Sequence, residues 1–99
     1  MLLILGTIRI APERLDDARP AMRRMAEATR AEPGCIAYHY AEDVLEPGLI
    51  HVVEHWSDRA AIDAHFGMPH IQEWRAAWPE LGIHDRRLQL FEAGEPSVI

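Results

Sequence analysis

The sequence predicts a small ferredoxin-like α+β domain with one antiparallel sheet of four strands, and two observations support this prediction. First, apolar and amphipathic segments follow one another in the order strand, helix, strand, strand, helix, strand. Second, the chain has 99 residues, which is the length of one domain, so we expect residues 1–99 to form a single unit.

The first strand is predicted over residues 2–10, which are mostly leucine and isoleucine. An apolar run of this length is typical of a strand that is buried on both faces. The run lacks the basic segment and the cleavage site of a secretory signal, and it is too short to cross a bilayer. We therefore expect a cytoplasmic protein that has no membrane partner.

A helix is predicted from Pro12 to the Glu32-Pro33-Gly34 turn, because proline suits a first helical turn and Pro-Gly ends a helix. Its apolar side chains recur at spacings of three and four residues, which places them on one face. They are Leu15, Ala18, Met22, Met25, Ala26 and Thr29. Pro20 lies inside this pattern and is expected to kink or split the helix.

Two further strands are predicted over residues 35–42 and 49–56, joined as a hairpin by a loop with a Pro-Gly turn signal. Successive side chains of a strand point to opposite faces. Tyr38 and Tyr40 therefore share one face of the first of these strands, and His39 lies on the other. The alternation leaves open which of the two faces looks toward the helices.

The second helical region begins after Asp58, which is a suitable N-cap for a helix over residues 59–67. Met68-Pro69 interrupts the helical pattern, which resumes over residues 70–78. A loop with Pro79 and Gly82 is expected next. The last strand is predicted over residues 87–93, and a tail follows it.

Large apolar side chains occupy both faces of the first and third strands. In the first strand, Leu3 and Leu5 alternate with Leu2 and Ile4. The two helices can cover only one face of a four-stranded sheet, so the other face needs a second apolar layer. The sheet of an identical subunit is the simplest such layer, and we therefore expect a homodimer.

Composition excludes several classes of function. The net charge of −6 disfavours nucleic acid as a partner, because phosphate backbones attract basic surfaces. Cys35 is the only cysteine, and no glycine-rich phosphate loop is present. His51 and His55 share one face of a strand but stand about 13 Å apart, too far to share a metal ion. We therefore expect neither a metal site nor a cofactor.

The segment over residues 54–70 resembles the central motif of the antibiotic biosynthesis monooxygenase family. The matching residues are Glu54, Trp56, Asp58, Ala61, His65 and His70. The Glu32-Pro33-Gly34-Cys35 junction between the first helix and the second strand is similar to the family pattern as well. Element order and length extend the resemblance over nearly the whole chain, and it implies a dimeric α+β barrel.

Members of this family include enzymes that oxygenate hydroxylated aromatic compounds or quinols with molecular oxygen, without a metal or an organic cofactor. The resemblance therefore implies a cofactor-independent monooxygenase with a small aromatic substrate. Another branch degrades heme, with an asparagine on the first strand and a tryptophan on the second helix. Here His65 stands in the place of that tryptophan, and the sequence contains no asparagine, which disfavours the heme reaction.

His65 is the candidate catalytic base, because a neutral imidazole can take a proton from a phenol or an enol, leaving a carbanion that reacts with oxygen. The candidate substrate-binding residues are Trp56, His70, Tyr38, Tyr40 and His39. Trp56 is expected to form a wall of the pocket. On a straight helix His65 and His70 would lie about 140° apart, so joint action depends on the break at Pro69.

Two alternative functions remain open. One is a non-catalytic dimer that binds a small ligand, and the other is an isomerase of a small phosphorylated carbonyl compound. A cleft that faces several arginines would favour the isomerase, whereas an aromatic cleft would favour the oxygenase. Glu54, on the same face as Trp56, is expected to be buried with an arginine partner such as Arg9 or Arg87.

Overall fold

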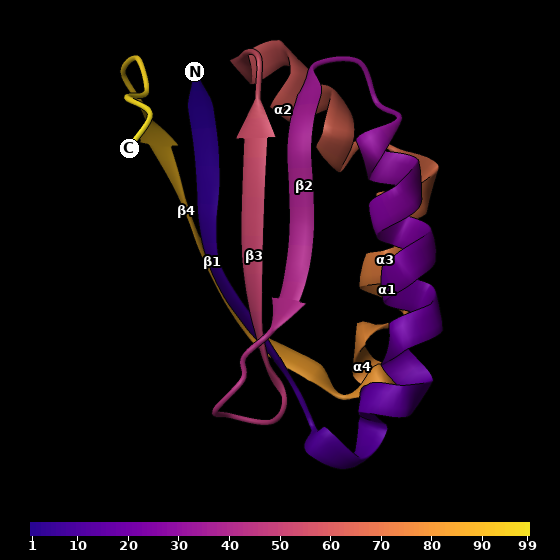
Figure 1. The fold of residues 1–99 in the computed structure, drawn as a ribbon. Coiled ribbons are helices and arrows are strands. Elements are labelled where there is room, and N and C mark those ends of the chain that lie inside the picture. The colour runs from indigo at the N-terminus through magenta and orange to yellow at the C-terminus, as the bar shows by residue number, and fades with distance from the viewer.

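Four antiparallel strands form one sheet in the order β2-β3-β1-β4 in the computed structural model, which describes residues 1–99 (Figure 1). The strands are β1 (Leu2–Ile10), β2 (Cys35–Glu42), β3 (Leu49–Trp56) and β4 (Ile83–Glu92). Strand β1 lies in the interior of the sheet and pairs with both β3 and β4. This topology confirms the predicted ferredoxin-like α+β fold.

The helices all cover one face of this sheet, and the opposite face is bare (Figure 1). They are the 3₁₀ helix η1 (Pro12–Arg14) and the α-helices α1 (Leu15–Arg30), α2 (Arg59–Phe66), α3 (Pro69–Ala76) and α4 (Trp78–Leu81). The core lies between the two layers, where buried side chains such as Ile8 and Val52 of the sheet face Met25 of α1. None of these helices has the length and apolar character needed to cross a membrane.

Three predicted boundaries differ from the structure. Helix α1 is continuous through Pro20, although this proline cannot donate the backbone hydrogen bond of its position. Residues Trp78–Leu81, predicted as a loop, form the short helix α4, which ends at Gly82 in the left-handed conformation. Strand β4 begins at Ile83 and not at residue 87. A register shift opposite β1 breaks the alternation of its first residues.

The bare face of the sheet carries partly exposed apolar side chains. Leu5 of β1 is opposite Val53 of β3, and they are 37% and 40% exposed. Phe91 of β4, opposite Leu3, is 45% exposed. This patch is the second apolar face that the sequence predicts, and the chain by itself leaves it in contact with water.

Candidate functional site

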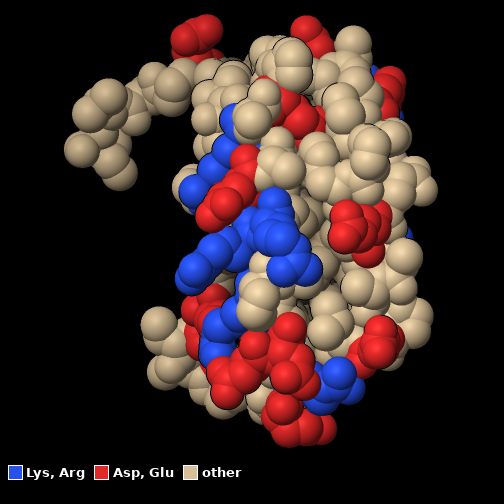
Figure 2. All heavy atoms as spheres, turned by 90° about the vertical axis from the view of Figure 1, so that its right-hand side faces the viewer, with Lys and Arg blue, Asp and Glu red and all other residues tan.

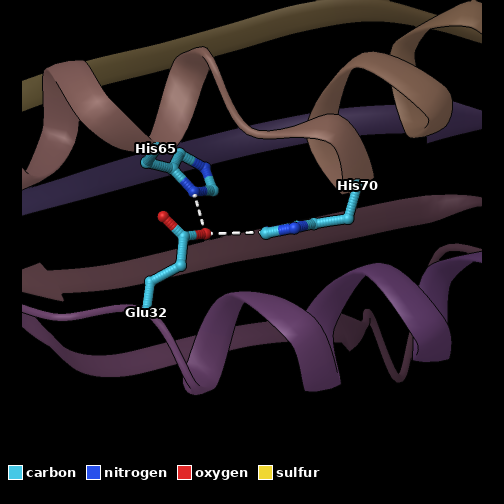
Figure 3. Close-up of side chains that lie close together, drawn as sticks. All are labelled: Glu32, His65 and His70. Carbon is cyan, nitrogen blue, oxygen red and sulfur yellow. Dashed lines mark hydrogen bonds and ion pairs between the residues drawn. The ribbon is translucent and has the colours of Figure 1, made fainter.

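The carboxylate of Glu32 contacts two histidines in the layer between the helices and the sheet, so side chains from three parts of the chain meet at one point. Glu32 follows α1, His65 lies in the last turn of α2, and His70 lies in the first turn of α3. Oε2 of Glu32 is 2.8 Å from Nδ1 of His65 and 2.7 Å from Nε2 of His70 (Figure 3). The side chains of Glu32 and His65 are almost completely buried, whereas that of His70 is 22% exposed.

The break between α2 and α3 is what brings the two histidines to one partner. Helix α2 ends at Phe66, and Met68 has an extended backbone with ψ 141°. Pro69 then starts α3 in a new direction, so His70 no longer follows the spiral of α2. The two imidazoles therefore point toward Glu32 together (Figure 3). The break at Pro69 therefore gives the two histidines a common partner, which joint action of His65 and His70 would require.

Glu32 owes its position to a tight turn between α1 and β2. Gly34 has a φ of +83°, which is the left-handed region that favours glycine. The turn packs closely on the next layer, since a Cβ on Gly34 would lie 2.5 Å from Cβ of Ala61. The amide N–H of Ser57 donates to the carbonyl of Gly34, so the turn is tied to the end of β3.

His65 is a neutral imidazole, and one of its two ring nitrogens is engaged in a hydrogen bond. Burial lowers its pKa, and the hydrogen bond to Glu32 opposes this effect only in part. In the tautomer that pairs with a carboxylate acceptor, Nδ1 of His65 donates its hydrogen to Oε2 of Glu32. The Nε2 atom of a neutral ring then carries the lone pair, which is the arrangement that a general base requires.

Aromatic rings surround His65. The ring centroid of Trp56 is 4.8 Å from that of His65, and the centroid of Tyr38 is 5.6 Å away. Tyr38 also stacks on Tyr40 at 5.6 Å. Burial raises the pKa of both tyrosines, so their hydroxyl groups stay protonated in the neutral range.

Glu54 is a second buried acid close to this cluster. Its Oε1 atom accepts a hydrogen bond of 2.9 Å from the indole N–H of Trp56. Burial raises the pKa of Glu54 to about 7, which the Trp56 hydrogen bond and the charge of Arg86 partly oppose. The expected ion pair with Arg9 or Arg87 is therefore wrong. Arg9 pairs with Glu46, and Arg87 pairs with Asp85.

The space next to His65 is small, but a larger hollow lies nearby. A cavity of about 20 Å³ is lined by six aromatic or imidazole side chains, namely Tyr38, Tyr40, His65, Phe66, Trp74 and Trp78, together with Glu54, Arg75, Arg86 and two aliphatic residues. A hollow of about 320 Å³ lies between α1 and α3 and includes Arg24, His70, Glu73 and Trp74. Trp74 lines both spaces, and its buried indole N–H has no hydrogen-bond partner.

Three further arginines lie away from this aromatic cavity. Arg19, Arg23 and Arg30 line a groove between α1 and β2, where Arg19 pairs with Glu42 and Arg30 donates to the carbonyl of Tyr38. Figure 2 shows basic and acidic side chains interleaved along one edge of the helix-covered face. The groove therefore does not present several free arginines.

Two of the predicted site residues, His39 and Trp56, are not among the residues that line the cavity next to His65. His39 lies on the bare side of β2, is exposed, and approaches Arg30, so it does not share a pocket with His65. Trp56 is completely buried and does not line the cavity, and its indole N–H donates to Glu54. The ring of Trp56 packs against the ring of His65.

Sequence reasoning left Glu32 without a functional role. The residue was noticed only as part of the turn that ends the first helix. The Glu-Pro-Gly junction is the available signal, because it places an acidic side chain at the end of an amphipathic helix. Trp74, Trp78 and Arg86 were missed as well, because cavity walls built from separate helices and strands leave no local pattern.

Comparison with known proteins gives a consistent family assignment. The sequence model for the antibiotic biosynthesis monooxygenase family matches residues 1–77 of this chain. A crystal structure of a "putative antibiotic biosynthesis monooxygenase" from Deinococcus radiodurans superposes with a TM-score of 0.92 at 31% identity. The match covers 100% of this chain and 98% of that one.

Two further relatives agree with this match. "Putative monooxygenase Rv0793" from Mycobacterium tuberculosis is 39% identical over 69 residues, which is 66% of this chain and 67% of that protein. Its solved structure superposes with a TM-score of 0.85 at 25% identity over 98% of both chains. "Putative monooxygenase YcnE" from Bacillus subtilis is 28% identical over 82% of this chain and 85% of its own length.

Proposed function

The chain belongs to the antibiotic biosynthesis monooxygenase family, and on that premise we propose that it is a cofactor-independent monooxygenase that acts on a hydroxylated aromatic or quinol-type small molecule. The observation that carries the proposal is the state of His65. It is a buried, neutral imidazole whose Nδ1 is fixed by Glu32, and it borders an aromatic cavity.

The reaction uses His65 as a general base. Nε2 of His65 takes a proton from the substrate, which becomes an electron-rich phenolate or carbanion. For an anthrone, the activated CH₂ carbon reduces O₂ directly. One oxygen atom becomes the new carbonyl, and the other leaves as water with the two hydrogens of that carbon. Glu32 holds the ring in the required tautomer and stabilises the imidazolium that forms during the proton transfer.

Substrate binding requires a side chain to move. A cavity of about 20 Å³ has room for little more than one water molecule, whereas ligand sites usually enclose about 300–1,000 Å³. The hollow between α1 and α3 is in that range, and Trp74 forms the wall that it shares with the cavity. We infer that an aromatic substrate enters from the side of His70 and displaces the ring of Trp74.

The lining of the cavity weighs against the alternative isomerase. A phosphorylated carbonyl substrate needs several cationic groups, but only Arg75 and Arg86 reach this cavity, among five aromatic residues. The aromatic lining also suits a binding protein without catalysis. That alternative differs from the oxygenase in one measurable respect, which is oxygen consumption.

The same proposal includes pairing of two identical chains. The apolar patch of Leu5, Val53 and Phe91 on the bare sheet face is the surface through which we propose that the chains associate. Burying this patch removes apolar area from water in both copies, which is the main driving force for association.

Replacement of His65 tests the proposed reaction. Anthrones and hydroquinones are screened for oxygen consumption by the wild-type protein, and His65→Ala is compared on any active substrate. Loss of a general base is expected to reduce kcat by about 10²–10⁴-fold. His39→Ala removes an exposed imidazole on the other face and should leave kcat unchanged. A folded His65→Ala protein with wild-type kcat would show that the base is another residue.

A further inference from the structure

We propose that Glu32, His65 and His70 form a binding site for a divalent transition-metal ion such as Zn²⁺. Nδ1 of His65, Nε2 of His70 and a carboxylate oxygen of Glu32 all lie within 4.8 Å of one another. They come from three different elements, so the site exists only in the folded chain. Two imidazoles and one carboxylate are a ligand set that binds zinc and other first-row metals while leaving one coordination position open.

The present spacing is close to what a metal ion needs. Zinc binds imidazole nitrogen and carboxylate oxygen at about 2.0–2.2 Å, so ligands in a tetrahedral arrangement stand about 3.3 Å apart. The two nitrogen–oxygen distances here are 2.8 and 2.7 Å. An ion between the three atoms therefore requires each imidazole to withdraw from Glu32 by about half an ångström. It also requires the two imidazole nitrogens, which lie within 4.8 Å of each other, to stand about 3.3 Å apart. Side-chain rotations of His70, which is partly exposed, and of Glu32 can supply most of this change.

The charge balance also favours a cation. The carboxylate of Glu32 is buried, and its only hydrogen-bond and ion-pair partners are the two imidazoles. None of the ten arginines forms an ion pair with it. A buried carboxylate is costly unless it is paired, and a bound metal ion would provide that pairing.

A route to the site is present. His70 lines the hollow of about 320 Å³ between α1 and α3, and the side chain of His70 is 22% exposed. An ion with its bound water can therefore reach the open side of the cluster without unfolding a helix. Glu73 and Arg24 both line this hollow, so the route carries one acidic and one basic side chain.

Metal binding has a chemical consequence, which rests on the proposed function. An ion on Nδ1 of His65 forces the remaining proton of the neutral ring onto Nε2. Nε2 then donates a hydrogen bond and has no lone pair for a substrate proton. The ion-bound form would therefore be inactive as an oxygenase, and removal of the ion would restore the base.

Direct measurement of metal binding tests the inference. Tag-free protein is stripped of metals, and binding of Zn²⁺ alone is followed by calorimetry and by metal analysis after gel filtration. Co²⁺ serves as a spectroscopic probe, because its visible absorption reports nitrogen and oxygen ligation in a low-coordinate site. We expect one ion per chain. Glu32→Gln and His70→Ala should each weaken binding by more than the roughly 10–100-fold that loss of an outer-shell partner costs.

His39→Ala is the matched control, because it removes an exposed histidine outside the cluster and should bind as the wild type does. Circular dichroism verifies that each variant is folded. His70→Ala is the variant that should disturb the core least, because the side chain of His70 is partly exposed. The inference is overturned if the wild-type protein binds no Zn²⁺, if both cluster variants bind it normally, or if His39→Ala abolishes binding. Oxygen consumption by the metal-free protein is measured separately, so the proposed oxygenase and the metal site can fail independently.

Discussion

At the scale of single residues, Glu54 gives the clearest pH dependence of stability. Its pKa is about 7 in the folded chain, against an ordinary value of 4.5. The folded chain therefore keeps a proton on Glu54 between pH 4.5 and pH 7, where the unfolded chain has lost it. The resulting stabilisation is complete below about pH 4.5 and is lost as the pH rises through about 7.

Glu54→Gln should remove this dependence, because the amide is neutral at every pH and its oxygen can still accept from Trp56. The free energy of unfolding is measured by urea denaturation from pH 4.5 to pH 8. Relative to the variant, we expect the wild type to lose at most about 3 kcal/mol over this range. Glu95→Gln, in the exposed tail, is the control and should run parallel to the wild type. If the free energies of unfolding of Glu54→Gln and of the wild type change in parallel with pH, ionising Glu54 costs the folded chain little stability.

The residue scale also shows where sequence reasoning stops. Placing His65 on a helix near an aromatic strand followed from periodicity and from the family motif. The identity of its partner did not, because Glu32 is 33 positions earlier in the chain. Contacts at such separation depend on how helices are stacked on the sheet, and no spacing rule within one element describes them. For the same reason the alternation of the third strand places Trp56 on the helix-covered face but does not give its position relative to His65.

At the scale of secondary-structure elements, the turn after α1 is the most sensitive point. Gly34→Ala would place a Cβ 2.5 Å from Cβ of Ala61 and 2.8 Å from Oγ of Ser57, at a φ that alanine disfavours. We expect a loss of about 1–3 kcal/mol in the free energy of unfolding. Activity should fall as well, because this turn positions Glu32. Thermal denaturation and oxygen consumption measure the two effects.

The matched control for this turn is Gly67→Ala. Gly67 has a φ of −91°, and a Cβ there would meet its nearest neighbour at 3.6 Å. This change should alter stability by less than about 0.5 kcal/mol. Equal effects of the two substitutions would indicate that the Gly34 turn tolerates a side chain, and the proposed link between the turn and Glu32 would lose its support.

Elements with strong local signals were predicted closely. The strands over residues 2–10, 35–42 and 49–56 have the predicted bounds. A long apolar run marks the first of them, and alternation with flanking turn residues marks the other two. The start of β4 was missed because Asp85 adopts a φ of +56° and interrupts the alternation of the strand. Helix α4 was missed because Pro79 and Gly82 are typical of loops, and only packing keeps four residues helical between them.

At the scale of the whole molecule, the bare sheet face should determine the association state. We predict that the wild-type protein sediments at about twice the chain mass of 11.3 kDa at micromolar concentration. Val53→Asp places a charge in the middle of the apolar patch and should yield a folded monomer, because burying an unpaired carboxylate at an interface is costly. Val44→Asp, in a loop where Val44 is 95% exposed, should remain dimeric. A monomeric wild type, or a dimeric Val53→Asp protein, would contradict the proposed pairing.

The interior position of β1 has a consequence for the order of folding. Strand β1 is flanked by β3 and by β4, so its second neighbour comes from the other end of the described chain. Closing so long a loop must precede the pairing of β1 with β4, which slows folding relative to proteins with local contacts. During synthesis one edge of β1 stays unpaired until β4 has been made. The nascent chain is therefore at its most vulnerable to edge-to-edge aggregation just before the last strand is made.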